Sequence, residues 1–312
     1  MRRQIIVMFC SFFLALAAVR AETGIPAPAQ TQTETQAAPN RGALFKVEGA
    51  GHTLYLFGTI HVGAPDFYPL EARVTAALER ASVLALEVDP NGDPAALSQA
   101  LNTYGMYASA GPPAGQVGPA FQARLERLLK RYAIVPSSVA RMKPWLLATV
   151  LAVNEFAAQG YLPALAVDNH LSQRARERNI PVLELESMAA QMALFERLTA
   201  AQQRRFLEQG IAAIEDKQQA RQASQIAQAW RKADAAALDG LARRAAADDS
   251  LSGRFVQKVL LEGRNPGLAE GIAGLLARER DSVAAIGVLH LVGARSVPDL
   301  LRQRGLRVER VY

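Results

Sequence analysis

The hydrophobic pattern at the start of the folded part predicts two strands, a helix and a further strand. Residues 43–58 contain two apolar runs separated by a Gly-Ala-Gly-His turn sequence, which predicts a β-hairpin. Apolar side chains then recur at helical spacing over residues 69–81, with Pro69 in a first-turn position. A second apolar strand, residues 82–88, contains Glu87 at its end. A strand, a helix and a strand in this order form a βαβ unit, so we expect parallel strands.

The middle of the chain, from about residue 93 to residue 280, has the pattern of helices. Apolar stripes predict helices at residues 121–132, 145–159 and 199–247. Two short strands are predicted within this part, at residues 162–167, where the pattern is ambiguous, and at residues 181–186. A short helix between them begins at Asp168, a capping residue type.

The last part of the chain returns to strand and helix patterns. Residues 282–287 predict a strand, residues 297–305 a helix, and residues 306–312 an alternating strand. Sheet is therefore expected from both ends of the chain and helix from its centre. These patterns predict an α/β fold with a mixed central sheet and a large helical insertion, in one domain over residues 42–312.

The first 21 residues have the composition of an export signal. Two arginines precede an apolar run from Ile5 to Val19, which is shorter than the ~20 residues of a membrane span. Small residues before Glu22 fit cleavage after Ala21, and a retained anchor helix is the alternative. Residues 22–41, rich in Pro, Thr, Gln and Ala, predict a disordered linker.

Cysteine and charge limit the classes of function. Cys10 is the only cysteine and is lost with the signal, so the mature chain cannot use disulfides. Loss of the signal also lowers the net charge from +6 to +3, and no basic stripe is interleaved with aromatic residues. We expect a periplasmic or secreted protein with no nucleic-acid partner and no stable membrane insertion after cleavage.

Two of the four histidines share one local sequence plan. His61 and His290 each follow an apolar strand and a Gly-x-x spacer that starts at Gly58 and Gly287. Ligands of parallel α/β sheets bind at the carboxyl ends of strands, so neighbouring strands would bring both imidazoles to one site. A histidine that merely follows a strand, with a capped or partly exposed side chain, is the alternative for each motif taken alone.

Carboxylates occur in the same strand-end pattern. Glu87 ends its strand, and Glu184 and Glu186 alternate in the next one, which places both on one face. Two histidines and carboxylates from separate strand ends form a donor set that suits Zn, Mn, Fe or Co, so these residues predict a metal site. A salt bridge or a solvated strand end is the alternative for Glu87.

These residues resemble the TraB/PrgY/GumN family, and the exported form with a short tether looks most like its GumN-type branch. The resemblance is carried by "LYLFGTIHVG", "VLALEVD", "AVDNHLSQRARERNIPVLELESMAAQ", "GRNPGLAEGI" and "IGVLHLVGARSVPDLLRQRGLRVERV". It implies an α/β core with helical additions and a relationship to the Tiki metalloproteases. It also implies metal-dependent hydrolysis, with His61, Glu87 and His290 at the positions of the family's site, so we predict these three residues as the metal ligands. Arg264-Asn265 fits a recurrent pair near that site.

Together, the residues and the resemblance predict an exported metal-dependent hydrolase that acts on peptides or another small-molecule substrate. The expected cofactor is a divalent metal ion, Mn, Co or Zn. The predicted site residues are, as catalytic residues, Glu87, Arg264 and Asn265 and, as substrate-binding residues, Asp168, His170 and Glu186. The alternative is a non-enzymatic periplasmic binding protein, for haem or a signal peptide, or an accessory factor in polysaccharide production.

Overall fold

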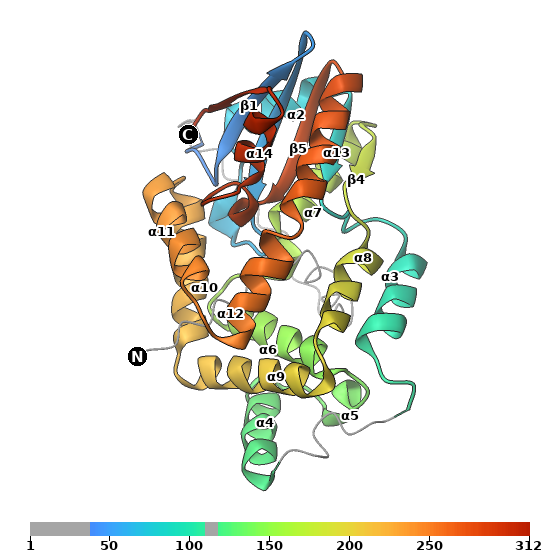
Figure 1. Ribbon diagram of the computed structural model, residues 1–312, viewed down its shortest axis with the longest axis vertical. Coiled ribbons are helices and arrows are strands. Elements are labelled where there is room, and N and C mark those ends of the chain that lie inside the picture. The colour runs from blue at the N-terminus through green and yellow to red at the C-terminus, as the bar shows by residue number, and fades with distance from the viewer. Residues whose placement is uncertain (1–37, 110–117) are drawn as a thin grey trace.

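The computed structural model describes residues 38–109 and 118–312 of the chain. The predicted signal peptide and most of the predicted linker lie outside these described residues. Among the helices that are described, none is long and apolar enough to cross a membrane. Figure 1 shows a sheet with its covering helices in the upper half of the view and a group of helices in the lower half.

A β-hairpin opens the described part of the chain, as predicted. Strands β1 (Leu44–Gly49) and β2 (His52–Thr59) pair antiparallel. The two residues of the turn, Ala50 and Gly51, have φ angles of 52° and 79°. This left-handed backbone at both positions is what a tight hairpin turn requires, because it matches the twist of the flanking strands.

The sheet has six strands in the order β4-β3-β5-β2-β1-β6. The four further strands are β3 (Val83–Leu86), β4 (Val182–Glu184), β5 (Asp281–Gly287) and β6 (Arg307–Arg310). Strands β4, β3, β5 and β2 run parallel, whereas β1 is antiparallel to both β2 and β6. The structure therefore confirms a mixed sheet built from both ends of the chain. The two strands of the predicted βαβ unit, β2 and β3, are parallel but do not pair with each other. Strand β5 lies between them and pairs with both.

Helices cover the two faces of this sheet. Helix α2 (Ala72–Arg80) packs against β2 and β5, and α7 (Val167–Glu177) packs against β3 and β4. Helix α13 (Asn265–Arg278) packs on β1, β2 and β5, and α14 (Val297–Gln303) packs on β6. Figure 1 shows α13 and α14 in front of the sheet and α2 behind it. The carboxyl ends of the parallel strands face the helical part of the molecule (Figure 1).

The central part of the chain is helical, as predicted. Besides α7 and α13, its α-helices among the described residues are α3 (Pro94–Ala100), α4 (Pro119–Arg131), α5 (Pro136–Val139), α6 (Pro144–Ala158), α8 (Met188–Ala193), α9 (Ala200–Glu215), α10 (Gln218–Arg231), α11 (Ala235–Ala246) and α12 (Leu251–Phe255). Short 3-10 or π turns are η2 (Pro65–Phe67), η3 (Leu101–Gly105), η4 (Pro163–Leu165), η5 (Leu194–Arg197), η6 (Val256–Leu261) and η7 (Val288–His290). Helix α6 is buried along most of its length because α9 and α10 pack against it. Its Trp145 ring stacks on Phe195, with 4.2 Å between the ring centroids.

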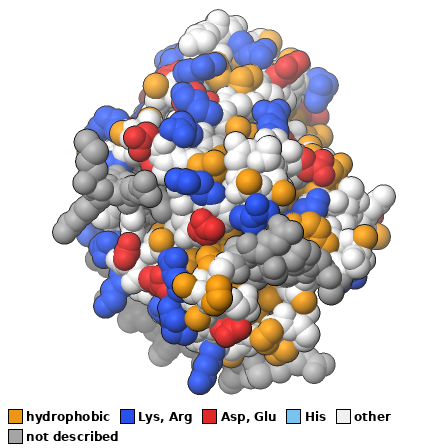
Figure 2. Space-filling model, turned by 60° about the horizontal axis from the view of Figure 1, so that its bottom comes forward, with side chains coloured by type: hydrophobic (Ala, Val, Ile, Leu, Met, Phe, Trp, Pro, Cys, Tyr) orange, Lys and Arg blue, Asp and Glu red, His pale blue; other side chains and the backbone are white. Residues whose placement is uncertain are grey.

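Charged side chains of both signs are interspersed on the surface of the helical part. Figure 2 shows Lys and Arg mixed with Asp and Glu among the described residues of the face in view. One pair joins α4 to α9, with 2.7 Å between Arg124 Nη2 and Glu215 Oε2. Exposed pairs contribute only ~0–1 kcal/mol, so the packing of this part depends mainly on its apolar core.

Three local predictions are wrong. Pro69 lies before α2, which begins at Ala72 with Glu71 as its N-cap residue, so Pro69 is not in the first turn. Residues 162–167 are not a strand but a 3-10 turn that leads into α7, and a proline within this run cannot donate to a strand ladder. Asp168 lies in the first turn of α7 and does not cap it, because its side chain turns toward β2.

Candidate functional site

The ends of three neighbouring parallel strands bring His61, Glu87 and His290 together. Glu87 directly follows β3, His61 lies two residues beyond β2, and His290 ends the short turn η7 after β5. All three side chains are buried, with exposed fractions of 2–3%. Since β5 separates β2 from β3, its own carboxyl end lies at the centre of this group.

Gly287 marks the point at which the three side chains converge. A Cβ atom on Gly287 would lie 3.2 Å from Glu87 Oε1, 3.3 Å from His61 Nε2 and 3.6 Å from His290 Cδ2. The Gly287 backbone N–H donates a hydrogen bond to Glu87 Oε1 at 2.6 Å. A Cβ atom here would be in unusually tight contact with Glu87 and His61, so a side chain at this position would require these groups to shift by a few tenths of an ångström.

A carboxylate orients His61. The His61 Nδ1 atom lies 2.6 Å from Asp168 Oδ2, and the Thr59 hydroxyl donates to the other oxygen of Asp168. Burial lowers the pKa of His61, but the charge and hydrogen bond of Asp168 outweigh it, so the net shift is upward. The ring is fixed with Nδ1 toward Asp168 and Nε2 toward Gly287.

An amide orients His290. Its Nδ1 lies 2.6 Å from Asn265 Oδ1, while Asn265 Nδ2 donates to the Arg295 carbonyl at 2.8 Å. Because Asn265 Oδ1 can only accept, His290 carries its proton on Nδ1, which leaves Nε2 unprotonated in the neutral ring. Burial lowers the pKa of His290 to about 3, and the Glu87 charge opposes this shift only in part.

Arg264 holds Glu87 in its ionised form. The Arg264 Nη2 atom lies 2.5 Å from Glu87 Oε2, and both side chains are almost fully buried. Burial raises the pKa of Glu87, but Arg264, the two histidines and the Gly287 N–H outweigh it and hold the pKa well below its usual range.

Arg264 also binds a second carboxylate. Its Nε donates to Glu186 at 3.1 and 3.0 Å, and Gln191 Nε2 donates to the same carboxylate at 2.9 Å. Glu184 instead accepts the Asp89 backbone N–H at 2.8 Å. The two glutamates of the predicted pair therefore have different partners, because β4 ends at Glu184.

His170 stands apart from these contacts. It lies on α7, where its half-buried ring contacts the Tyr68 ring in a tilted arrangement with 4.4 Å between the ring centroids. Burial lowers its pKa, as does the nearby charge of Arg174. Its predicted role in substrate binding stays a prediction.

Sequence reasoning missed three contributors to the site. These are Thr59, the Gly287 backbone N–H and Gln191. Thr59 could have been found, since it precedes His61 by two residues on an extended strand end, where period two brings side chains to one side. Gln191 gives no comparable signal, because the start of α8 decides where its amide points.

The donor types suit a divalent metal, although the described residues contain no group of three or more His, Cys, Asp or Glu already placed to hold one. His290 Nε2 and Glu87 Oε1 are 3.7 Å apart, and His61 Nε2 borders the same cradle. A ligating histidine usually donates its other ring nitrogen to a carboxylate or carbonyl oxygen, as both of these rings do. By the chemistry of these donors, His61, His290 and Glu87 fit such an ion.

The chain belongs to a known family. The model of the TraB/PrgY/gumN family matches residues 43–310, so the chain is a member of that family, as the sequence motifs predicted. It is similar to the uncharacterized protein YbaP of Escherichia coli strain K12, with 24% identity over 256 residues that cover 80% of this chain and 87% of YbaP. YbaP of Shigella flexneri gives the same values. No solved structure matches the chain.

Proposed function

We propose that this protein is an exported metal-dependent hydrolase that acts on peptides. One observation carries the proposal: the Nδ1 atoms of His61 and His290 are held by Asp168 and Asn265 at 2.6 Å, so both Nε2 atoms border the cradle beside Glu87, where His61 would bind a metal in its deprotonated form. Export and a periplasmic or secreted location rest on the signal-like sequence of residues 1–21.

The two histidines, Glu87 and the residues that orient the histidines each have a role in this proposal. His61, His290 and Glu87 Oε1 would hold a divalent ion such as Mn, Co or Zn. When bound, such an ion supplies Lewis acidity toward a carbonyl group and lowers the pKa of water. Asp168 and Asn265 fix the tautomer and the angle of each ring, which makes them positioning residues.

Arg264 contributes by keeping the Glu87 carboxylate ionised and fixed in position. Its donors are directed to Glu87, Glu186 and the Leu260 carbonyl. A planar guanidinium bridges two carboxylates through donors fixed in one plane, whereas a lysine ammonium lacks this fixed donor geometry. The role follows from the position of Arg264 between the two glutamates.

A peptide-cleavage assay tests the proposal. The purified mature chain is incubated with a peptide library, with and without Mn²⁺, Co²⁺ or Zn²⁺. We expect cleavage that needs metal and that is lost in His61→Ala, His290→Ala and Glu87→Gln. His52→Ala is the matched control, because His52 lies in the hairpin and bonds the Leu276 carbonyl. Metal-independent cleavage, or full activity in all three variants, would overturn the proposal.

Glu87→Gln also separates two roles. Loss of metal together with activity identifies Glu87 as a ligand, and loss of activity with metal retained identifies it as a general base. No cleavage of any peptide by a chain that binds metal would favour the alternative of a binding protein.

A further inference from the structure

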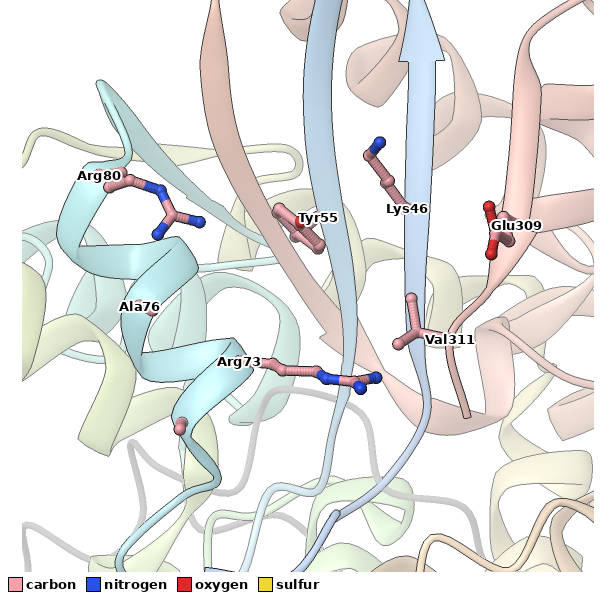
Figure 3. A pocket seen from close by; sticks show the side chains of 8 residues that line it. Lys46, Tyr55, Arg73, Ala76, Arg80, Glu309 and Val311 are labelled. Atoms are coloured by element: carbon pink, nitrogen blue, oxygen red, sulfur yellow. The ribbon is translucent and has the colours of Figure 1, made fainter. Parts of the chain in front are cut away.

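A pocket of about 390 Å³ lies at the sheet, between α2 and the strands β1, β2 and β6. Its lining is basic, with three positive side chains and one negative one: Lys46, Arg73, Arg80 and Glu309, together with Tyr55, Ala72, Ala76 and Val311. Figure 3 shows Arg73 and Arg80 reaching from α2 toward the sheet, opposite Lys46 and Glu309. None of these residues belongs to the candidate active site.

The strand register builds one side of this pocket. Lys46 of β1 is the direct cross-strand partner of Tyr55 of β2 and of Glu309 of β6. The three side chains therefore form a row on one face of the sheet. Helix α2 packs on β2 and β5, which leaves this row open at its side.

The helix builds the other side. Ala72, Arg73, Ala76 and Arg80 fall within about 100° of the helix circumference, so they face the pocket together. Ala76, with its small side chain, lies between the two arginines on this face of the helix. Seven residues of helix separate the two guanidinium-bearing positions by ~10 Å along the axis.

Neither Arg73 nor Arg80 makes a salt bridge within the described residues. The acidic residues at the two ends of this helix have other partners. Glu79 pairs with Arg178 at 2.7 Å, and Glu71 is buried and accepts the Tyr312 hydroxyl. Burial raises the pKa of Glu71 to about 7, so it offsets the charge of Arg73 only in part at neutral pH.

Helix stability does not explain Arg73. It lies in the first turn of α2, where the helix dipole favours an acidic side chain and disfavours a cation. Arg80, in the last turn, agrees with the dipole. A cation in the first turn, only partly offset by Glu71 and directed into a pocket lined by two others, is instead suited to an anionic ligand.

We propose that this pocket binds a small organic molecule or polyphosphate with two anionic groups, one held by Arg73 and the other by Arg80. The Tyr55 ring and the alanines contact the body of the ligand between them. Lys46 contributes less, because its ammonium group is paired with Glu48 at 2.5 Å. The proposal is independent of the hydrolase site and of its metal.

Titration calorimetry with the full mature chain tests this proposal, at constant ionic strength, with citrate and with tripolyphosphate as the two probes. We expect binding of one molecule per chain for at least one probe, and the stronger probe tells whether carboxylate or phosphate is preferred. Arg73→Gln and Arg80→Gln should each weaken binding by about 5–10-fold, the loss of one charge-assisted contact at a partly exposed site. The double variant should not bind.

Arg205→Gln is the matched control, since Arg205 is an exposed arginine of helix α9 outside the pocket. It should bind like the parent. Thermal unfolding without ligand verifies that each variant is folded. No binding of either probe by the parent, or equal binding by the parent and the double variant, would overturn the proposal.

Discussion

The two Gly-x-x-His motifs have the same sequence plan but different surroundings. His61 is backed by the Asp168 carboxylate, and His290 is backed by the Asn265 amide, at the same 2.6 Å distance. The pKa of His61 is raised, whereas that of His290 is lowered to about 3. Equal positions at two strand ends therefore carry rings with very different proton affinities.

The difference shows what a strand-end motif determines and what it leaves to the rest of the fold. The strand, the glycine and the spacer place each imidazole at the same edge of the sheet. The helix that packs behind each ring then supplies its partner, α7 for His61 and α13 for His290. One ring of the pair favours the charged form, and the other stays neutral, available to a metal at any ordinary pH.

The largest effect is expected where both motifs share a partner. Arg264 lowers the pKa of both histidines and pairs with Glu87 at 2.5 Å. Arg264→Met leaves two carboxylates, one of them fully buried, without their cation, and should lower the free energy of unfolding by about 3–5 kcal/mol. Urea unfolding measures this value. Arg264→Lys keeps the charge and should cost less; a loss below ~1 kcal/mol for the methionine variant would contradict the account.

Exchanging the partners should exchange the behaviour of the two rings. Asp168→Asn should lower the pKa of His61, and Asn265→Asp should raise that of His290, because each change removes or adds a neighbouring negative charge. Metal affinity should fall by ~10–100-fold in Asp168→Asn, as for other residues that orient a ligand. Nitrogen-15 NMR of the imidazoles measures the two pKa values, and calorimetry measures the metal affinity. Unchanged pKa values of both histidines in these variants would contradict the claim that Asp168 and Asn265 cause the difference between the two rings.

The two histidines should also affect stability in opposite pH ranges in the metal-free chain. His61 has a raised pKa, so its stabilising contribution is complete below pH 6.5 and is lost as the pH rises through its folded-state value. His290 has a lowered pKa, so its contribution is complete above pH 6.5 and is lost as the pH falls toward 3. Urea unfolding of His61→Asn and of His290→Asn against the parent, from pH 4 to pH 9, should show these opposite trends. The same trend for both variants would be the contrary result.

The smallest effect is expected from Thr59, which acts on the His61 ring only through its hydrogen bond to Asp168. Thr59→Val removes one hydrogen bond to Asp168 and should cost ~1 kcal/mol of unfolding free energy. It should lower the preference of His61 for its charged form only slightly, since the Asp168 charge remains. A pKa shift as large as that of Asp168→Asn would show that the hydroxyl, and not the carboxylate charge, sets the state of His61.

Much of the fold could be predicted from periodicity and turn chemistry. The hairpin, the strands at both ends and the long central helices follow local patterns, and the structure confirms them. The order of the sheet could not be read in this way, because β5 inserts between β2 and β3 from the far end of the chain.

The candidate site, like the fold, could be predicted from the sequence only in part. His61, Glu87 and His290 could be singled out, because each follows an apolar run and carries a group that is costly to bury alone. Asp168 resembled a helix cap in the sequence, and its actual partner, His61, lies 107 residues away. Contacts of this kind depend on tertiary packing, which local patterns do not encode.

Metal titration of the two motifs tests the central claim most directly. The chelator-treated chain is titrated with Zn²⁺, Mn²⁺ and Co²⁺ by calorimetry, beside His61→Ala, His290→Ala and the control His52→Ala. The account predicts a single tight site for at least one of these ions in the parent and the control. Each of the two histidine variants should bind that ion at least ~100-fold more weakly, because it lacks a proposed ligand. Binding as tight in His61→Ala and His290→Ala as in the parent, or no binding by the parent, would contradict the account.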